Sequence, residues 1–224
     1  TDISLMSASN DVIGTLNASG ASISVVDANA LTLGDVTASD ALTIQVTDTL
    51  ELSGSINIGS VDLTSTAGNI TQSAGALNVL TGATDLQASG SITLTQANAF
   101  GGTLNVAGAT DVTLNETDAL LTLGDITASG ILDVTAATDL ALDGVIQVAT
   151  FDATATAGAI TQSDEGQLTV TAGPTDLTAG TDISLMSASN DVIGTLNASG
   201  ASISLVNANA LTLGDVTASD ALTV

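Results

Sequence analysis

Apolar and polar residues alternate along the chain in short runs that begin and end on aliphatic side chains. The clearest runs are Ile3-Ser-Leu5, Ile23-Ser-Val25, Leu31-Thr-Leu33, Leu42-Thr-Ile44, Leu50-Glu-Leu52, Ile56-Asn-Ile58, Leu77-Asn-Val79 and Ile92-Thr-Leu94. A period of two predicts strands with one buried face and one polar face. Residues typical of turns separate these runs, namely Asn29, Gly34, Asp40, Gly54, Gly59, Gly68 and Gly75. No stretch has the spacing of an amphipathic helix, so the pattern predicts an all-β chain.

The same pattern returns at fixed intervals. Residues 181–224 match residues 1–44 at 41 of 44 positions and differ only at Val25/Leu205, Asp27/Asn207 and Ile44/Val224. A weaker match has half this spacing, since LTLGDVTAS at 31–39 returns as LTLGDITAS at 121–129, 90 residues later. The chain therefore consists of repeats 1–90 and 91–180 and a partial third repeat, 181–224. We expect them to form one continuous domain over 1–224.

Strand number and glycine spacing indicate how the repeats fold. Gly14, Gly34, Gly54 and Gly75 follow one another at steps of 20, 20 and 21 residues. Roughly a dozen short strands per repeat, taken three at a time, give about four coils of about 20–26 residues, as in a parallel β-solenoid. At about 4.8 Å per coil, roughly ten coils make a rod about 50 Å long. An array of immunoglobulin-like modules is the alternative, but its buried Trp and tyrosine corner are missing.

Composition removes many classes of function. All 24 formal charges are negative, and the chain has no Lys, Arg, His or Cys. Binding to nucleic acid and docking on anionic membranes both depend on basic residues, so we expect neither partner. Nucleophilic triads, thiolate chemistry, zinc sites with nitrogen or sulfur ligands and Schiff bases are excluded for want of the same side chains. No apolar stretch is long enough to span a membrane as a helix, and a start at Thr1 without a basic leader predicts a fragment of a longer protein.

Three strings in the chain resemble a known family of repeats. They are ITQSAGALNV at 70–79, ITLTQANAFGGTLNVAGATDVTLNETDALLTLGDITASG at 92–130 and DISLMSASNDVIGTLNASGASISLVNANALTLGDVTAS at 182–219. Their style is similar to the degenerate repeats of filamentous-haemagglutinin-like giant adhesins of Gram-negative bacteria, and the resemblance extends over the whole chain. It implies a right-handed β-helix, export across the outer membrane, and display at the cell surface or in the biofilm matrix. In that family such repeats form the shaft.

Repeated carboxylates invite an enzyme interpretation, because some β-helical enzymes cleave acidic polysaccharides with clustered Asp residues. Asp35, Asp125 and Asp215 return in each LTLGD motif, and Asp85 and Asp176 return in two TDL motifs. A catalytic site is single, whereas a structural residue repeats. We therefore expect these side chains to cap turns through local hydrogen bonds to the backbone. The sequence predicts no enzyme and no catalytic, cofactor-binding or metal-ligating residue.

Binding interpretations stay open for three sets of side chains. Asp oxygens of stacked coils could ligate calcium, although no calcium-binding nonapeptide and no EF-hand loop occurs. Gln72 and Gln162, in the two ITQS motifs, are expected to be stacked amides inside the rod or at its rim. Ice-binding solenoids present ranks of outward Thr, but most strand Thr residues here stand singly, namely Thr32, Thr43, Thr93, Thr113 and Thr122, and the run Thr154-Ala-Thr156 occurs once.

Together these observations favour a non-catalytic structural shaft within a secreted bacterial surface adhesin or an extracellular filament. The expected partners are neighbouring repeats of the same protein, with self-association of rods into fibres, and no cofactor is expected. The expected location is extracellular or at the bacterial cell surface. A calcium- or ice-binding β-solenoid module is the alternative function.

Overall fold

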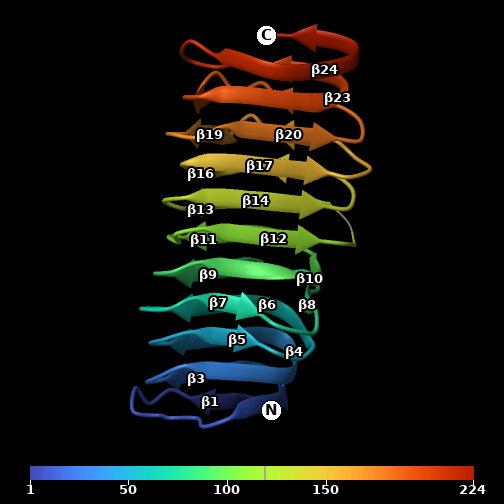
Figure 1. Cartoon of the computed structure of the whole chain (residues 1–224). Helices are drawn as coiled ribbons and strands as arrows, with labels where there is room; N and C mark the ends of the chain where they lie inside the picture. Colours follow the sequence, from blue (N-terminus) through green and yellow to red (C-terminus); the bar gives the residue numbers. More distant parts are fainter. Residues whose placement is uncertain (119) are drawn as a thin grey trace.

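The computed structural model of the chain describes residues 1–118 and 120–224, and its regular structure consists of β-strands. The strands form one parallel sheet that winds as a β-solenoid of about 11 turns, which we call coils (Figure 1). The N-terminus lies at one end of the rod and the C-terminus at the other. The predicted all-β parallel solenoid is confirmed. The immunoglobulin-like alternative is wrong, because its strands would be antiparallel, whereas the described strands pair in parallel.

A sheet of 24 strands makes up the described part of the rod. The first ten are β1 (Ile3–Leu5), β2 (Thr15–Gly20), β3 (Ile23–Asp27), β4 (Leu31–Val46), β5 (Leu50–Leu52), β6 (Ile56–Ser65), β7 (Ile70–Gln72), β8 (Leu77–Val79), β9 (Thr84–Ala88) and β10 (Ile92–Phe100). The next seven are β11 (Thr103–Ala107), β12 (Val112–Glu116), β13 (Leu121–Thr127), β14 (Ile131–Ala136), β15 (Leu140–Leu142), β16 (Val145–Val148) and β17 (Thr150–Ala155). The last seven are β18 (Ile160–Gln162), β19 (Gln167–Val170), β20 (Thr175–Ala179), β21 (Ile183–Leu185), β22 (Asp191–Val192), β23 (Thr195–Leu205) and β24 (Thr212–Thr223). Among the described residues, no helix is long and apolar enough to cross a membrane.

Strands pair with those one coil earlier and one coil later, so equivalent residues form columns along the rod. One inward column contains Leu31, Leu50, Ile70, Ile92, Val112, Leu132, Phe151, Thr175, Leu196 and Leu213. Successive members are between 17 residues apart, from Leu196 to Leu213, and 24 residues apart, from Phe151 to Thr175. The coils are therefore close to the expected 20–26 residues, and several are shorter.

The inward columns fill the rod with aliphatic side chains. Leu50, Leu63 and Ile70 are completely buried, because each packs against inward residues of the coils on both sides. Thr84 and Thr175 also point inward, and their hydroxyls have no hydrogen-bond partner among the described residues. The core is thus continuous along the rod and almost entirely apolar.

Three residues predicted to lie in turns belong to strands instead. Gly34 and Asp40 lie within β4, and Gly59 lies within β6. The chain bends near them without leaving the sheet, since the pairing of β4 with β6 only shifts register between Ala38 and Ala41. A register shift of this kind lets a strand bend while its hydrogen bonds continue on both sides.

The 90-residue repeat does not equal a whole number of coils. Leu42 and Leu132 are equivalent in sequence, 90 residues apart. Leu42 lies in the column of Ile23 and Val61. Leu132 lies instead in the column of Leu31, which runs beside it. One repeat therefore spans four coils and part of a fifth, and equivalent residues of successive repeats lie on different faces of the rod.

A β-bulge accompanies each change of face. One Asn lies opposite two residues of the next coil in three places: Asn17 opposite Gly34 and Asp35, Asn105 opposite Gly124 and Asp125, and Asn197 opposite Gly214 and Asp215. Beyond the second bulge, β13 pairs with two strands of the following coil, β15 and β16. Because the bulge divides one strand into two, the following repeat starts on the next face.

Candidate functional site

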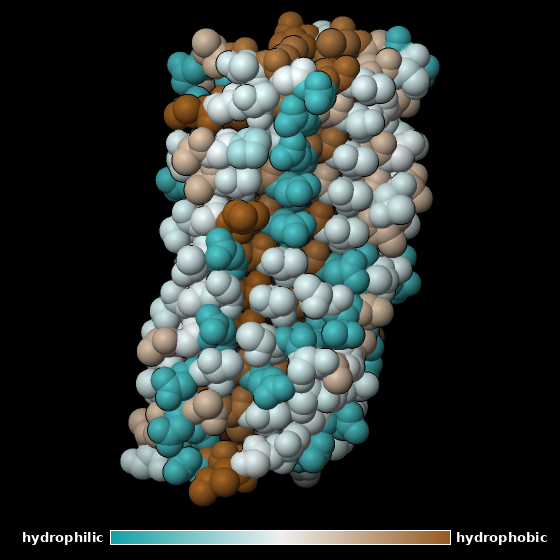
Figure 2. All heavy atoms as spheres, in the orientation of Figure 1, coloured by the Kyte–Doolittle hydropathy of each residue, from teal (hydrophilic) through white to brown (hydrophobic). Residues whose placement is uncertain are grey.

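Outward side chains also form columns, and one column changes character halfway along the rod. It contains Thr15, Thr32, Glu51, Thr71, Thr93, Thr113, Asp133, Asp152, Asp176 and Asn197. Its first half is mostly Thr, whereas its second half holds three consecutive carboxylates. We call Asp133, Asp152 and Asp176 the upper ladder. Hydrophilic side chains stand in line over β14, β17 and β20, the strands of this ladder (Figure 2).

A second, shorter line of carboxylates lies on another face. This outward column contains Ser4, Ser24, Thr43, Asp62, Asp85 and Asn105. We call Asp62 and Asp85 the lower ladder. Asp62 is equivalent to Asp152 in the repeat, and Asp85 is equivalent to Asp176. The two ladders lie on different faces because the repeat advances by one face.

Stacked carboxylates change one another's acidity. Burial against the strand surface raises the pKa of Asp62 above its ordinary value, and the charge of Asp85 raises it further. Burial likewise raises the pKa of Asp152, with added contributions from the charges of Asp133 and Asp176. Both shifts disfavour the ionised form. Protonation therefore relieves repulsion within each ladder.

An Asn side chain ends each ladder and joins it to a bulge. Asn105 Nδ2 donates to Asp85 Oδ1 at 2.8 Å, and Asn105 Oδ1 accepts from the N–H of Asp125 at 3.1 Å. Asn197 makes the two corresponding bonds at the next bulge. A Cβ at Gly124 would lie 2.1 Å from Asn105 Oδ1, so a larger residue there would displace the amide from its bond to the N–H of Asp125.

Two Asp residues of the LTLGD motifs, Asp35 and Asp125, accept hydrogen bonds from backbone N–H groups, but these bonds are not local. Asp35 Oδ1 accepts from the N–H of Ser55 at 2.9 Å, 20 residues further along the chain. Asp125 Oδ1 accepts from the N–H of Val145 at 2.9 Å over the same separation. The prediction of local capping is wrong for these two, because the solenoid places the backbone of the next coil within reach of the carboxylate. The bonds join successive coils.

The TDL motifs also lie elsewhere than expected. Asp85 lies within β9 and Asp176 lies within β20. The prediction that they cap turns is therefore wrong. In both strands the preceding Thr points into the core and the Asp points outward, as strand alternation requires.

Two amide pairs connect neighbouring coils, and the first of them is buried whereas the second is partly buried. Gln72 Nε2 donates to Asn98 Oδ1 at 2.7 Å, and Asn98 Nδ2 donates back to Gln72 Oε1 at 3.1 Å. Gln162 forms the same pair with Asn190, at 2.7 and 2.9 Å. The expectation of internal amides is confirmed. The Asn partners could not be assigned from the sequence, because they lie 26 and 28 residues away.

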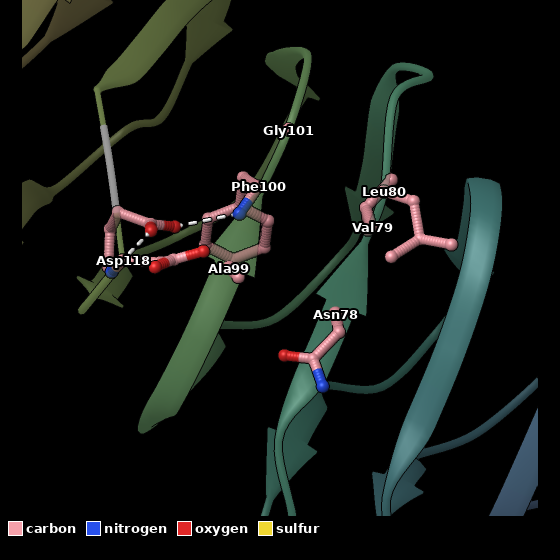
Figure 3. A pocket seen from close by; sticks show the side chains of 8 residues that line it. Asn78, Val79, Leu80, Ala99, Phe100, Gly101 and Asp118 are labelled. Atoms are coloured by element: carbon pink, nitrogen blue, oxygen red, sulfur yellow. Dashed lines mark hydrogen bonds between the residues drawn. The ribbon is translucent and has the colours of Figure 1, made fainter.

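Glu116 is a buried polar residue that the hydrophobic pattern did not reveal. Its carboxylate accepts from the N–H of Phe100 at 2.7 Å and from that of Asp118 at 2.9 Å, drawn as dashed lines in Figure 3. A hollow of about 110 Å³ adjoins it. Asp27 and Asn207 are its equivalents and also accept backbone N–H bonds. One sign of this buried polar position was present in the sequence. The two nearly identical segments differ there by Asp27 and Asn207, so the position stays polar although its charge changes.

The described residues form neither a cluster of acidic ligands for a cation nor a long rank of Thr residues for ice. The described residues contain no group of three or more acidic side chains that could hold a metal ion. Thr71, Thr93 and Thr113 align on three successive coils. This rank is bounded by the carboxylates Glu51 and Asp133.

A comparison with family models matches the chain to a family described as repeats of unknown function (DUF5649). The match covers residues 39–107, 109–155 and 138–199, which together are more than half of the chain. The chain belongs to this family. A search of curated proteins finds no match, and a search of solved structures also finds none.

Two of the three DUF5649 segments contain corresponding parts of the structural repeat. Segments 39–107 and 138–199 each contain one amide pair and one Asn that ends a ladder. Both segments end at equivalent positions, 107 and 199, in the strand that faces a bulge. These two segments therefore include the contacts that join coils through amides and carboxylates.

Proposed function

We propose that the chain is a non-catalytic structural shaft within a secreted bacterial adhesin or another extracellular filament. The observation that carries this proposal is the single parallel sheet, which continues with its aliphatic core from the first coil to the last. In such a rod each coil is stabilised by the coils on both sides, and bending would break many interstrand hydrogen bonds together. Stiffness along the axis is the property that a shaft requires.

The arrangement of surface charge supports the same proposal. Because equivalent residues move to another face in each repeat, the carboxylates wind around the rod. A binding face for ice or for a row of cations would need one outward column to keep its residue type over many coils. All formal charges of the chain are negative, so repulsion opposes side-by-side packing of rods, and the self-association expected from the sequence requires these charges to be screened.

The extracellular location and the link to adhesins rest on the resemblance to filamentous-haemagglutinin-like repeats. We expect an antibody against the chain to label intact cells of the organism that produces it. Labelling that appears only after the cells are permeabilised would contradict this location.

Stiffness can be measured directly, because the chain has no Cys and accepts two spin labels at chosen places. Asp48 and Asp164 are exposed residues outside the strands, and each can be replaced by Cys. Pulsed electron paramagnetic resonance should give one narrow distance distribution between the two labels. A broad distribution would indicate modules joined by hinges and would overturn the shaft. A saturable change of the distance with calcium would favour the alternative binding module.

A further inference from the structure

The first coil of the rod is an uncovered copy of a coil that is covered elsewhere in the same molecule. Residues 1–24 and 181–204 are identical in sequence. β21 lies on β18 of the preceding coil, whereas β1 pairs with β3 above it and with no described strand below it. As a result Leu185 is 2% exposed, whereas its equivalent Leu5 is 42% exposed.

Comparison with the covered copy shows that one side-chain oxygen of the uncovered coil lacks its hydrogen-bond donors. In the covered copy, Asn190 Oδ1 accepts from Gln162 Nε2 and from the N–H of Leu168, at 2.7 and 2.9 Å. Asn10 is the equivalent residue of the first coil. Its Nδ2 donates to two backbone carbonyls, as that of Asn190 does. Its Oδ1 accepts no hydrogen bond from the part of the chain that the structure describes.

A third copy of this coil, which contains Asn98, is covered by a coil that also carries a Gln. Asn98 Oδ1 accepts from Gln72 Nε2 at 2.7 Å and from the N–H of Leu77 at 2.9 Å. Both covering coils therefore carry an Ile-Thr-Gln-Ser strand followed by a strand of the form Leu-x-Val, at 70–79 and 160–170. Wherever the structure places a coil beneath this Asn, a Gln side chain and the N–H of a Leu donate to the Asn oxygen.

A coil of another kind would not satisfy the Asn side chain. In the column of Gln72 the preceding coil carries Leu52. A coil of that kind would bring an aliphatic side chain against the amide and would leave its oxygen buried without a donor, which costs about 1–3 kcal/mol. Single buried polar residues fix register in coiled coils in the same way. The amide pair, present once per repeat, thus selects which coil lies below.

We propose that the edge formed by residues 1–18 is a docking surface for a solenoid coil that carries Ile-Thr-Gln-Ser, and that Asn10 recognises its Gln. The occupant is a coil from another DUF5649 repeat, with the sequence character of residues 157–180. Its Gln exchanges two amide hydrogen bonds with Asn10, and its Leu-x-Val strand donates one N–H to Asn10 Oδ1. Its apolar residues bury Ile3 and Leu5. This inference rests on the proposed shaft function and specifies which repeat unit joins the shaft at this edge.

The test uses the full chain with a second copy of residues 91–180 added before Thr1, so that the new junction repeats the sequence around residues 180 and 181. The readout is hydrogen exchange at the amide of Ser7. Its equivalent, Ser187, donates to Gln162 Oε1 at 3.1 Å in the covered copy. We expect the Ser7 amide to exchange freely in the unextended chain and to be protected by about 100-fold in the extended chain, as a closed structural unit is.

Two variants of the added segment identify the residue responsible. Gln162→Ala in that segment should remove most of the protection at Ser7. Gln147→Ala, which shortens an exposed outward side chain of the same segment, is the matched control and should leave the protection unchanged. Free exchange at Ser7 in the extended chain, or protection that survives Gln162→Ala, would overturn the recognition by Asn10.

Electron microscopy of the same extended chain separates this inference from the shaft proposal. The added repeat should lengthen the rod by about 20 Å, at about 4.8 Å per coil. A straight, longer rod in which Ser7 is not protected would overturn only the recognition, whereas a hinge at the junction would overturn the shaft. Protection of Ser7 that grows with the concentration of the unextended chain would show that a second copy occupies the edge, and would contradict the proposed Gln-bearing coil.

Discussion

Residues 1–24 and 181–204 have the same sequence, yet one segment lies at an end of the rod and the other lies inside it. Both begin with a three-residue strand, β1 in one and β21 in the other. Their inward side chains differ in exposure, since Ile3 is only partly buried whereas Ile183 is buried. Strand formation therefore follows the local pattern, and burial follows the neighbouring coil. In a solenoid, stability resides largely in the interfaces between coils.

The largest contrast should come from removing the same apolar side chain in both copies. Leu185→Ala should lower the free energy of unfolding by about 2–5 kcal/mol, because it leaves a cavity between two coils. Leu5→Ala should cost much less, since Leu5 is already partly in water. Urea denaturation followed by circular dichroism measures both. Equal losses would show that the first coil is covered in solution and would break the comparison.

The amide pair should give the next largest difference. Asn190→Ala leaves the partly buried amide of Gln162 and the buried N–H of Leu168 without a partner, and the buried N–H alone costs about 1–3 kcal/mol. Asn10→Ala removes the same side chain where no Gln faces it, so the loss should be smaller. Hydrogen exchange of the Leu168 amide provides a local readout. An unchanged exchange rate in the Asn190→Ala chain would contradict this role.

Two covered copies should, in contrast, respond alike. Thr84 and Thr175 occupy equivalent inward positions, and both hydroxyls are buried without a partner in the described structure. Replacement of either by Val removes a desolvated hydroxyl at nearly constant volume and should stabilise the rod by about 1 kcal/mol. Thr93→Val, on the outward face, is the control and should bring no such gain. A loss of stability at Thr84 or Thr175 would reveal a hidden partner for the hydroxyl.

The smallest effect concerns pH and compares the two ladders. The pKa of Asp152 is raised in the folded rod, so the folded state takes up a proton at higher pH than the unfolded chain does. Its contribution to stability therefore increases as pH falls through this raised pKa and levels off below 3.8, the ordinary value. Asp152→Asn should raise stability slightly at neutral pH and weaken its pH dependence. Asp62→Asn should do so less, because one charged neighbour acts there instead of two.

Urea titrations at several pH values test this order. Asp164→Asn also removes one negative charge, from an exposed turn outside the ladders, and serves as the control. If stability depends on pH to the same extent in the Asp152→Asn and Asp164→Asn chains, overall net charge explains the effect and the ladder does not.

The predicted strand positions were correct, whereas the predictions for polar residues were only partly so. Runs such as Leu50-Glu-Leu52 and Leu77-Asn-Val79 are strands β5 and β8. Gly34 and Asp40 were misplaced in turns because a bend in a continuing strand has the same residue types as a turn. Asp85 was misplaced because its repetition indicated a structural role without indicating on which element it lies.

Contacts between coils could not be derived from residue types. The bonding partners of Gln72 and of Asp35 lie 26 and 20 residues away. Predicting them would require the length of each coil between them. Coil length varies from 17 to 24 residues in one column, so an error of a few residues assigns the wrong neighbour.

The sequence by itself determined the all-β character, the inward and outward side of the strands that carry alternating aliphatic residues, and the repeat of 90 residues. These are properties of neighbouring residues or of direct identity along the chain, and a period of two needs no knowledge of the rest of the fold. Only the tertiary structure decided which coils meet and on which face each repeat lies. The bulge that places one Asn opposite a Gly-Asp pair moves each repeat to the next face, so Asp62 and Asp152 occupy equivalent positions in sequence and different sides of the rod. That outcome depends on the register between strands of different coils, which side-chain packing and interstrand hydrogen bonds set once the chain has closed its coils.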